Sequence, residues 1–166
     1  DNLAEYERKA QLLNYEGVRA MFEAFVARRP GATGVIHWMF NSAWPKLWWQ
    51  LFDYYLMPTG AFYGAKKACQ PLHLIYDYET REIIASNLNG QKSDKLKATV
   101  VVLDINSKEK YKAEFPVELP PDSWLSLVKL PGPGELPDVY FLDLKLSGPK
   151  GELKDENFYC LTRQLD

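Results

Sequence analysis

Four of the five tryptophans in this chain lie in one short stretch, namely Trp38, Trp44, Trp48 and Trp49. Tryptophan combines a large apolar ring system with a single hydrogen-bond donor, so a cluster of four requires a particular environment. An indole face can stack on the apolar face of a sugar ring, and a tryptophan-rich loop can form such a platform. The same side chains could equally belong to a hydrophobic core, so the residue types alone leave both interpretations open.

Other side chains capable of chemistry are few. His37 precedes Trp38, so on a strand the two side chains point to opposite faces, and His37 is expected to be a satisfied core histidine. His73 has no second histidine or cysteine nearby, which argues against a metal site. The run Gly132-Pro133-Gly134 lacks the Gly-Lys-Ser/Thr ending of a phosphate-binding loop. We therefore expect neither a metal nor a cofactor.

The composition is that of an ordinary globular chain of 166 residues, with 46% hydrophobic and 25% charged residues. A formal net charge of -2 gives no electrostatic footprint for nucleic acid or an anionic membrane. No apolar run reaches the ~18 residues of a membrane-spanning helix, and the first residues contain no apolar signal-peptide core. Cys69 and Cys160 are far apart in the sequence and are expected to be free thiols.

The sequence divides into a helical, aromatic part at residues 1–70 and a strand-rich part at residues 71–166. A long helix is predicted over Leu3–Arg29, because apolar positions recur there every three or four residues. Asn2 is a suitable N-cap, and a Pro-Gly pair ends the pattern.

A short apolar run rich in strand-forming residues follows at Gly34–Phe40 and predicts a strand buried on both faces, as in a parallel sheet. After an aromatic loop with one or two irregular helical turns at Lys46–Tyr55, a second helix is predicted over Gly60–Cys69, with Thr59 as its cap. Helix, strand, loop and helix make one turn of an α/β architecture. The predicted strand needs neighbours on both edges, and this chain does not contain them.

The second part contains seven strand candidates separated by turn signals. They are Leu72–Asp77, Glu82–Asn87, Ala98–Ile105, Tyr111–Leu119, Trp124–Leu130, Val139–Leu146 and Phe158–Arg163. Pro116, on the polar-facing side of the fourth candidate, marks an edge strand or a bulge. Seven short strands at this spacing predict an immunoglobulin-like β-sandwich.

The stretch GVIHWMFNSAWPKLWWQLFDYYLMPTGAFYGAKKACQPLHLIYDYETREIIASN, residues 34–87, resembles glycoside hydrolase family 2 enzymes of the exo-β-glucosaminidase and β-mannosidase branch. In that branch, the eighth strand of a (β/α)8 barrel carries a similar tryptophan-rich motif, followed by a GAKKA-type segment and an immunoglobulin-like domain. The closing run DENFY, residues 155–159, resembles the SDNFY ending of that domain. Here Asp155 stands in place of the serine and Glu156 in place of the aspartate.

This resemblance implies that residues 1–70 are the C-terminal end of a (β/α)8 barrel and that residues 71–166 are an immunoglobulin-like β-sandwich domain. Leu3–Arg29 would be the seventh barrel helix, Gly34–Phe40 the eighth strand and Gly60–Cys69 the eighth helix. Active sites of such barrels lie at the C-terminal ends of the strands. The tryptophan cluster would then lie where the substrate binds.

Family 2 enzymes resemble the retaining template, in which one carboxylic acid protonates the leaving oxygen and a carboxylate attacks the anomeric carbon. The resemblance places both glutamates on earlier barrel strands, so no catalytic residue is assigned in this chain. Trp38 is the best candidate for stacking on the sugar, Asn41 could bond sugar hydroxyls or orient a carboxylate, and Trp44 could line the pocket. Trp48 and Trp49 are adjacent and cannot face the same way, so one of them is expected to be packing.

The remaining polar residues of the first part are expected to have structural roles. Glu5, Glu16 and Glu23 are expected on the solvated face of the long helix. Asp53 is expected to bond amides of the aromatic loop, and Lys46 is expected to be solvated.

Three functions stay open: a segment of a family 2 glycosidase, a non-catalytic carbohydrate-binding or interaction module, and a structural sandwich that supports a barrel. The first implies a carbohydrate substrate and a missing upstream barrel as partners, and the resemblance implies a secreted or periplasmic parent protein. The sandwich strands show no exposed aromatic row, which favours a supporting role for that domain. If the apolar run Gly34–Phe40 lacks a cover, the chain is expected to associate with itself.

Overall fold

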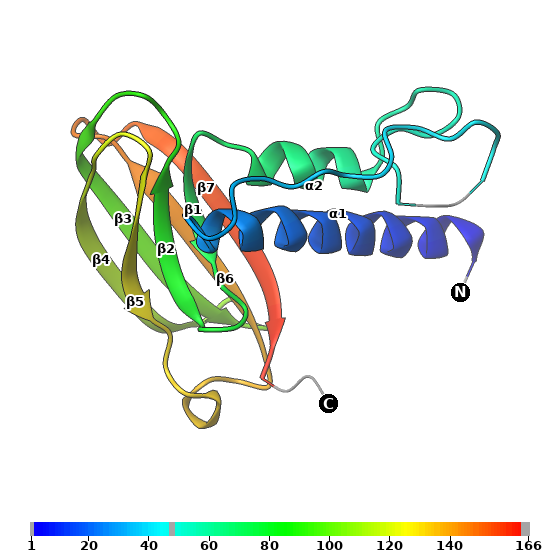
Figure 1. Ribbon diagram of the computed structural model, residues 1–166. Helices are drawn as coiled ribbons and strands as arrows, with labels where there is room; N and C mark the ends of the chain where they lie inside the picture. The colour runs from blue at the N-terminus through cyan, green and yellow to red at the C-terminus, as the bar shows by residue number, and fades with distance from the viewer. Residues whose placement is uncertain (1, 47–48, 164–166) are drawn as a thin grey trace. The chain divides into compact units, whose positions relative to one another are not determined.

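The computed structural model describes residues 2–46 and 49–163. The chain divides into two compact units, unit 1 at residues 1–70 and unit 2 at residues 71–166. The described residues of unit 1 form two helices joined by a long segment, and those of unit 2 form seven strands and a short 3-10 helix at Pro133–Glu135 (Figure 1). The division falls where the sequence changes from helical and aromatic to strand-rich.

The first helix, α1, spans Leu3–Ala27, and the predicted long helix is confirmed. The Asn2 side chain caps it by accepting a hydrogen bond from the Glu5 amide at 3.0 Å. Glu5 also forms an exposed ion pair with Lys9, one turn later, at 2.9 Å. Its expected position on a solvated face is therefore confirmed.

The same helix buries charge on another face, where the expectation of solvated glutamates is wrong. Glu23 is only 1% exposed, and Glu16 is partly buried beside Arg19, which is fully buried and paired with it. Burial raises the pKa of the Glu16 carboxyl, and the Arg19 guanidinium acts in the opposite direction. A charged residue signals solvation in a sequence, but an arginine partner allows a carboxylate to leave water.

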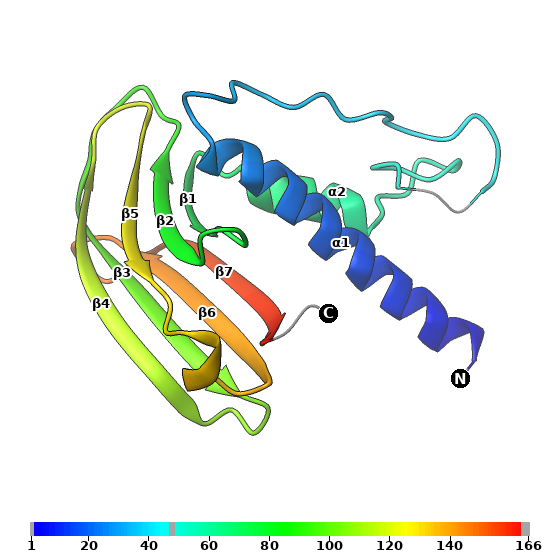
Figure 2. The ribbon, with the colours of Figure 1, turned by 60° about the horizontal axis from the view of Figure 1, so that its bottom comes forward.

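The second helix, α2, spans Gly60–Ala68 and lies alongside α1 in both views (Figures 1 and 2). The two backbones approach closely at Gly60 and Gly64. The Gly60 amide donates to the Gln11 side chain at 2.6 Å, and a Cβ added at Gly64 would lie 2.4 Å from the Tyr15 carbonyl oxygen. Gly60 lies next to Gln11, and Gly64, one turn later in α2, lies next to Tyr15, one turn later in α1. The two helices therefore run in the same direction.

Thr59 occupies the N-cap position of α2, as predicted, but its side chain accepts no capping hydrogen bond. Its hydroxyl instead donates to the carbonyls of Gln50 and Leu51, at 2.8 and 3.1 Å. Thr59 therefore fastens the preceding loop, a role that local spacing does not reveal.

The predicted strand Gly34–Phe40 is not formed in this chain. The described residues there are extended or bent without a strand assignment, and Ile36 is 96% exposed. A parallel strand needs hydrogen-bonded neighbours, and none pairs with this segment among the described residues. The nearest pairing is a pair of isolated bridges, from Asn41 to Phe52 and from Phe52 to Pro58. The predicted helical turns at Lys46–Tyr55 are also wrong for the described residues, which form bends and a turn.

Unit 2 folds as two antiparallel sheets, and each of the seven predicted strands is present. The strands predicted from Ala98 and Phe158 begin five residues earlier, at Ser93 and Leu153. The three-stranded sheet has the order β1 (Leu72–Tyr76), β2 (Glu82–Asn87), β5 (Ser123–Lys129). The four-stranded sheet has the order β4 (Glu109–Leu119), β3 (Ser93–Asp104), β6 (Val139–Ser147), β7 (Leu153–Thr162). Strand β4 is an edge strand, as Pro116 predicted, because proline cannot donate to a second neighbour.

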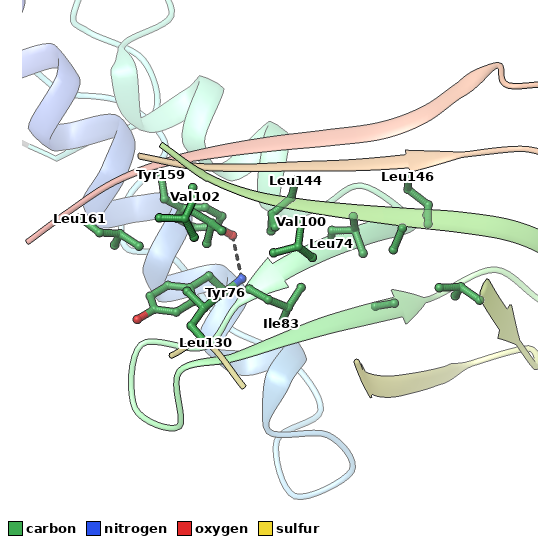
Figure 3. Close-up of a cluster of buried hydrophobic side chains, with 14 of the residues drawn as sticks. Leu74, Tyr76, Ile83, Val100, Val102, Leu130, Leu144, Leu146, Tyr159 and Leu161 are labelled. Carbon is green, nitrogen blue, oxygen red and sulfur yellow. Dashed lines mark hydrogen bonds between the residues drawn. The ribbon is translucent and has the colours of Figure 1, made fainter. Parts of the chain in front are cut away.

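The core of unit 2 lies between the two sheets (Figure 3). Val100 of β3 pairs in register with Leu144 of β6, and both point inward and are fully buried. Leu74 and Ile83 of the other sheet face them and are also fully buried. Each such side chain stabilises the fold by about 1.5–3 kcal/mol relative to exposure. Every second side chain of these strands faces this shared interior, which explains the period-two alternation of apolar residues in the sequence.

Side chains of β7 occupy the open edge of β1, where a further strand would otherwise pair. The Leu74 amide donates to Asp155 Oδ2 at 2.9 Å. The Tyr76 amide donates to the Tyr159 hydroxyl at 3.0 Å (Figure 3). The Nδ2 atom of Asn157 donates a hydrogen bond to the Leu74 carbonyl at 3.0 Å. His73 Nδ1 lies 2.8 Å from Asp155 Oδ2. These bonds satisfy edge groups that would otherwise be unpaired.

The phenol of Tyr140 leads to a pH prediction. Burial raises its pKa from 10.0 to about 12, and a hydrogen bond with Tyr76 acts in the same direction against Arg81. Between these two values the unfolded chain loses this proton while the folded chain keeps it. Proton linkage therefore lowers the free energy of unfolding as the pH rises through this window. Urea unfolding of the wild type and Tyr140→Phe is expected to show the steeper loss in the wild type.

The phenolate absorbance provides a matched check. The chain contains ten tyrosines, so the wild-type minus Tyr140→Phe difference isolates one titration step. That step is expected near pH 12. A Tyr140 step at about pH 10, the usual range for tyrosine, would contradict the prediction.

Candidate functional site

Trp38 lies in a surface hollow of about 390 Å³ between α1 and the connecting segment of unit 1. Its side chain is 77% exposed. The Trp49 indole N–H donates to the Trp38 carbonyl at 2.7 Å, and His37 Nε2 lies 3.2 Å from the Trp49 carbonyl oxygen. Both side chains also line the hollow, so hydrogen bonds fix the backbone while the Trp38 indole stays available to a ligand.

Of the three predicted site residues, Trp38 lines this hollow and the other two do not. Trp44 is 63% exposed, and the Lys46 ammonium lies 5.4 Å from the centre of its ring, a cation–π arrangement. Asn41 is partly buried and donates only locally, to the Ser42 carbonyl at 3.2 Å. Neither lines the Trp38 hollow. The expectation of a simply solvated Lys46 is incomplete, because its ammonium contacts this indole face.

Of the adjacent pair, Trp49 lines the Trp38 hollow, whereas Trp48 lies outside the described residues. Trp49 is 47% exposed and contributes both a ring surface and the hydrogen bond to Trp38. The sequence could not choose between the two tryptophans, because the loop that carries them has no regular period.

A second hollow, of about 450 Å³, lies between the first turns of α1 and residues 45–59. We call it the Asp53 hollow. Glu7, Gln11 and Asn14 line it from one face of α1, and Asp53 and Gln50 line it from the segment. This hollow was not predicted from the sequence, although the spacing of the three helical residues places them on one face of the helix.

Asp53 has the structural role expected of it. Its Oδ1 atom accepts a hydrogen bond from the Met57 amide at 2.9 Å, and its backbone amide bonds the Met57 carbonyl at 3.0 Å. Gln50 is 2% exposed, and its Nε2 atom has no hydrogen-bond partner among the described residues. A buried amide without a partner costs about 1–3 kcal/mol, so this side chain is the unusual one in the hollow.

No cluster of three metal-ligating side chains occurs in the described part of the chain. His73, which was not expected to bind a metal, is fully buried, and its Nδ1 atom lies 2.8 Å from Asp155 Oδ2. No described helix is both long and apolar enough to cross a bilayer.

Comparison with curated proteins gives matches along the whole chain. It is 40% identical over 172 residues to an exo-β-D-glucosaminidase of Streptomyces avermitilis, which covers 99% of this chain and 19% of the relative. It is 31% identical over 165 residues to a mannosylglycoprotein endo-β-mannosidase of Lilium longiflorum, covering 96% of this chain and 17% of the relative. No protein-family profile matches the chain.

Among solved structures, the exo-chitosanase of Amycolatopsis orientalis is 34% identical with a TM-score of 0.92, covering 99% of this chain and 20% of that one. Along its whole length the chain is therefore similar to exo-β-D-glucosaminidases and to a β-mannosidase, as the motif resemblance predicted. The chain spans about a fifth of the length of the curated relatives that it matches.

Proposed function

We propose that this chain is the C-terminal segment of a retaining exo-β-glycosidase that hydrolyses O-glycosidic bonds of carbohydrates. The similarity to exo-β-D-glucosaminidases along the whole chain carries the proposal. In the retaining reaction, one carboxylic acid protonates the leaving oxygen while a carboxylate attacks the anomeric carbon. We assign neither group to this chain. Its role is to form one wall of the sugar pocket and to support that wall.

In this proposal Trp38 stacks on the sugar, and Asn41 and Trp44 complete the wall. The exposure of the Trp38 indole supports stacking, because its ring is open to solvent while its backbone is held by Trp49. Asn41 keeps amide capacity for a sugar hydroxyl or a catalytic carboxylate, since its described bond is only local.

The proposed architecture follows the same reasoning. Unit 1 would be the end of a (β/α)8 barrel, in which Gly34–Phe40 becomes a strand once neighbouring strands are present. The 96% exposure of Ile36 supports a face that awaits such neighbours. Unit 2 would be an immunoglobulin-like domain, which its seven antiparallel strands in two sheets support.

The Trp38 wall is tested in the longer protein that contains this segment. Trp38→Ala is expected to lower kcat/KM about tenfold or more, because a lost stacking contact of about 1.4 kcal/mol corresponds to a factor of ten. The substrate is p-nitrophenyl β-D-glucosaminide, since a variant of the Amycolatopsis enzyme forms a complex with it. Trp38→Phe, which keeps an aromatic face, is expected to retain most of the activity.

Trp124→Ala serves as the control, because Trp124 is an exposed tryptophan on β5 in the other unit. Equal kcat/KM values for Trp38→Ala and the wild type would contradict the wall. The alternative is a non-catalytic carbohydrate-binding or interaction module. It is favoured if no longer protein hydrolyses glycosides and this chain alone binds an oligosaccharide.

A further inference from the structure

We propose that Asn89 is a site of spontaneous covalent modification, at which its side-chain amide converts to the carboxylate of aspartate or isoaspartate. Asn89 and Gly90 lie in the link between β2 and β3, and both residues are exposed (Figure 1). Water is the co-reactant, and no enzyme or cofactor is needed. The inference concerns unit 2 alone and is independent of the proposed glycosidase activity.

The reaction joins two atoms of neighbouring residues. The Gly90 amide nitrogen loses its proton to hydroxide and attacks Cγ of Asn89. A bond forms between these two atoms, the Cγ–Nδ2 bond breaks, and Nδ2 leaves as ammonia after it takes up a proton. Water then opens the resulting five-membered succinimide ring. Attack at Cγ gives aspartate, and attack at the main-chain carbonyl carbon gives isoaspartate, with no atom oxidised or reduced in either case.

The Gly90 amide is available for this attack. It donates no hydrogen bond among residues 2–46 and 49–163, and the link is bent there without a hydrogen-bonded turn. A bonded N–H must open before its nitrogen can lose the proton, so an exposed amide without a partner reacts more readily. The Asn89 side chain is exposed and makes no hydrogen bond in the same part of the chain, so Cγ can turn toward the nitrogen.

The fold does not require glycine at position 90. An Asn-Gly pair commonly forms a two-residue hairpin turn in which both residues have positive φ. Neither Asn89 nor Gly90 has a positive φ here, and a Cβ added to Gly90 would meet no atom within 4 Å. The missing side chain therefore has its main effect on reactivity, because nothing crowds the attacking nitrogen.

Two other asparagines show what protects this residue type. Asn106 is exposed and precedes a small residue, but the Ser107 amide donates to the Asp104 carbonyl at 2.9 Å. Asn157 is buried in β7, and its Oδ1 atom accepts from the Phe158 amide at 3.1 Å. In both cases the nitrogen that would attack is held in a hydrogen bond. Asn89 is therefore expected to react before either of them.

The modification acts on the hydrogen bonds of Asn87, the buried last residue of β2. Its Oδ1 atom accepts from the Asn89 amide at 3.0 Å, and its Nδ2 atom donates to the Gln91 carbonyl at 2.9 Å. Isoaspartate adds one carbon to the main chain between these two contacts, so both cannot keep their geometry. A buried amide that loses its partners destabilises the fold, so the modified chain is expected to unfold more easily.

The test is an ageing experiment on this 166-residue chain at pH 6 and at pH 8, with a reducing agent because Cys69 and Cys160 are exposed. Peptide mass spectrometry measures conversion at each asparagine, and an isoaspartate-specific methyltransferase measures the isoaspartate fraction. Conversion at Asn89 is expected to be about tenfold faster than at Asn106, since the Ser107 amide must first open. It is also expected to be faster at pH 8, because hydroxide removes the Gly90 proton. Conversion no faster at Asn89 than at Asn106, or equal at the two pH values, would overturn the proposal.

Urea separates the structural cause from the residue types. In the unfolded chain the Ser107 amide loses its bond to Asp104, so conversion at Asn106 is expected to accelerate. Conversion at Asn89 is expected to change little, because its neighbouring amide is already open in the folded chain. Acceleration of both sites by the same factor would refute an open Asn89–Gly90 pair.

Gly90→Ala is the matched variant, because its Cβ enters open space. The fresh variant is expected to unfold at the same urea concentration as the fresh wild type, while its conversion at Asn89 is slowed severalfold. Ageing is expected to lower the urea midpoint of the wild type and to leave that of Gly90→Ala in place. Equal conversion at Asn89 in the variant and the wild type would contradict the proposed attack by the Gly90 nitrogen.

Discussion

Replacing Asp155 by alanine is expected to lower the free energy of unfolding of unit 2 by about 3 kcal/mol or more. One oxygen, Oδ2, accepts from the Leu74 amide at 2.9 Å and lies 2.8 Å from His73 Nδ1. Asp155 and His73 are buried, and water cannot replace the lost acceptor without opening the edge of β1. The cost therefore includes two unsatisfied donors in addition to the lost hydrogen bonds.

Urea unfolding followed by circular dichroism measures the global effect, and NMR amide exchange of Leu74 measures the local one. Asp155→Asn keeps an acceptor oxygen and is expected to cost less than the alanine variant. Glu156→Ala, the next residue on the exposed side of β7, is expected to stay within about 0.5 kcal/mol of the wild type. Equal stability of the Asp155 and Glu156 alanine variants would contradict a special role for the edge contact.

The strand content of unit 2 could be predicted from the sequence because each strand alternates locally and is bounded by turn residues. The network at the edge of β1 could not. Asp155, Asn157 and Tyr159 alternate toward the interior like core residues, but their partners lie on a strand more than eighty positions away. Strands β1 and β7 come together only when the two sheets pack in the folded domain. The hydrogen bonds of the buried polar residues of β7 therefore could not be predicted from the sequence of β7 alone.

The strand prediction at Gly34–Phe40 failed for a different reason. Its apolar run describes a segment that needs cover on two faces, and a ladder can form only with neighbouring strands. Among residues 2–46 and 49–163 no strand pairs with this segment, and Ile36 and Trp38 are exposed. The apolar run therefore indicates that the segment requires apolar cover on both faces. The structure shows the segment without neighbouring strands among the described residues.

Trp38 could be proposed as a site residue from the sequence, whereas the Asp53 hollow could not. Trp38 was chosen from residue type and motif position, and its exposed indole is compatible with that choice. The Asp53 hollow was missed because it combines α1 with a segment far along the chain. That segment is held by the Met57 amide, which donates to Asp53, and by the Thr59 hydroxyl, which donates to the Gln50 carbonyl. Loop closure of this kind depends on single side-chain contacts that have no period in the sequence.

Gly64→Ala is expected to disrupt the packing of α2 on α1 and to destabilise unit 1 by about 1–3 kcal/mol. The added Cβ would lie 2.4 Å from the Tyr15 carbonyl oxygen and 3.1 Å from the Arg19 amide nitrogen. Both atoms belong to the backbone of α1, so no side-chain rotation can relieve the clash. The helices must separate, and the neighbouring contacts of Ala61 and Ala65 with Val18 weaken with them.

Gly17→Ala on α1 is the matched control, because a Cβ there meets no atom within 4 Å. Alanine in an exposed helical position is favoured over glycine by about 0.5–1 kcal/mol, so this variant is expected to be more stable than the wild type. Thermal unfolding followed at 222 nm, where the helices dominate the signal, compares the two substitutions. Opposite signs for the same chemical change would establish that close backbone approach, and not helix propensity, sets the requirement for glycine at position 64. A Gly64→Ala variant as stable as Gly17→Ala would contradict the close packing of the two helices.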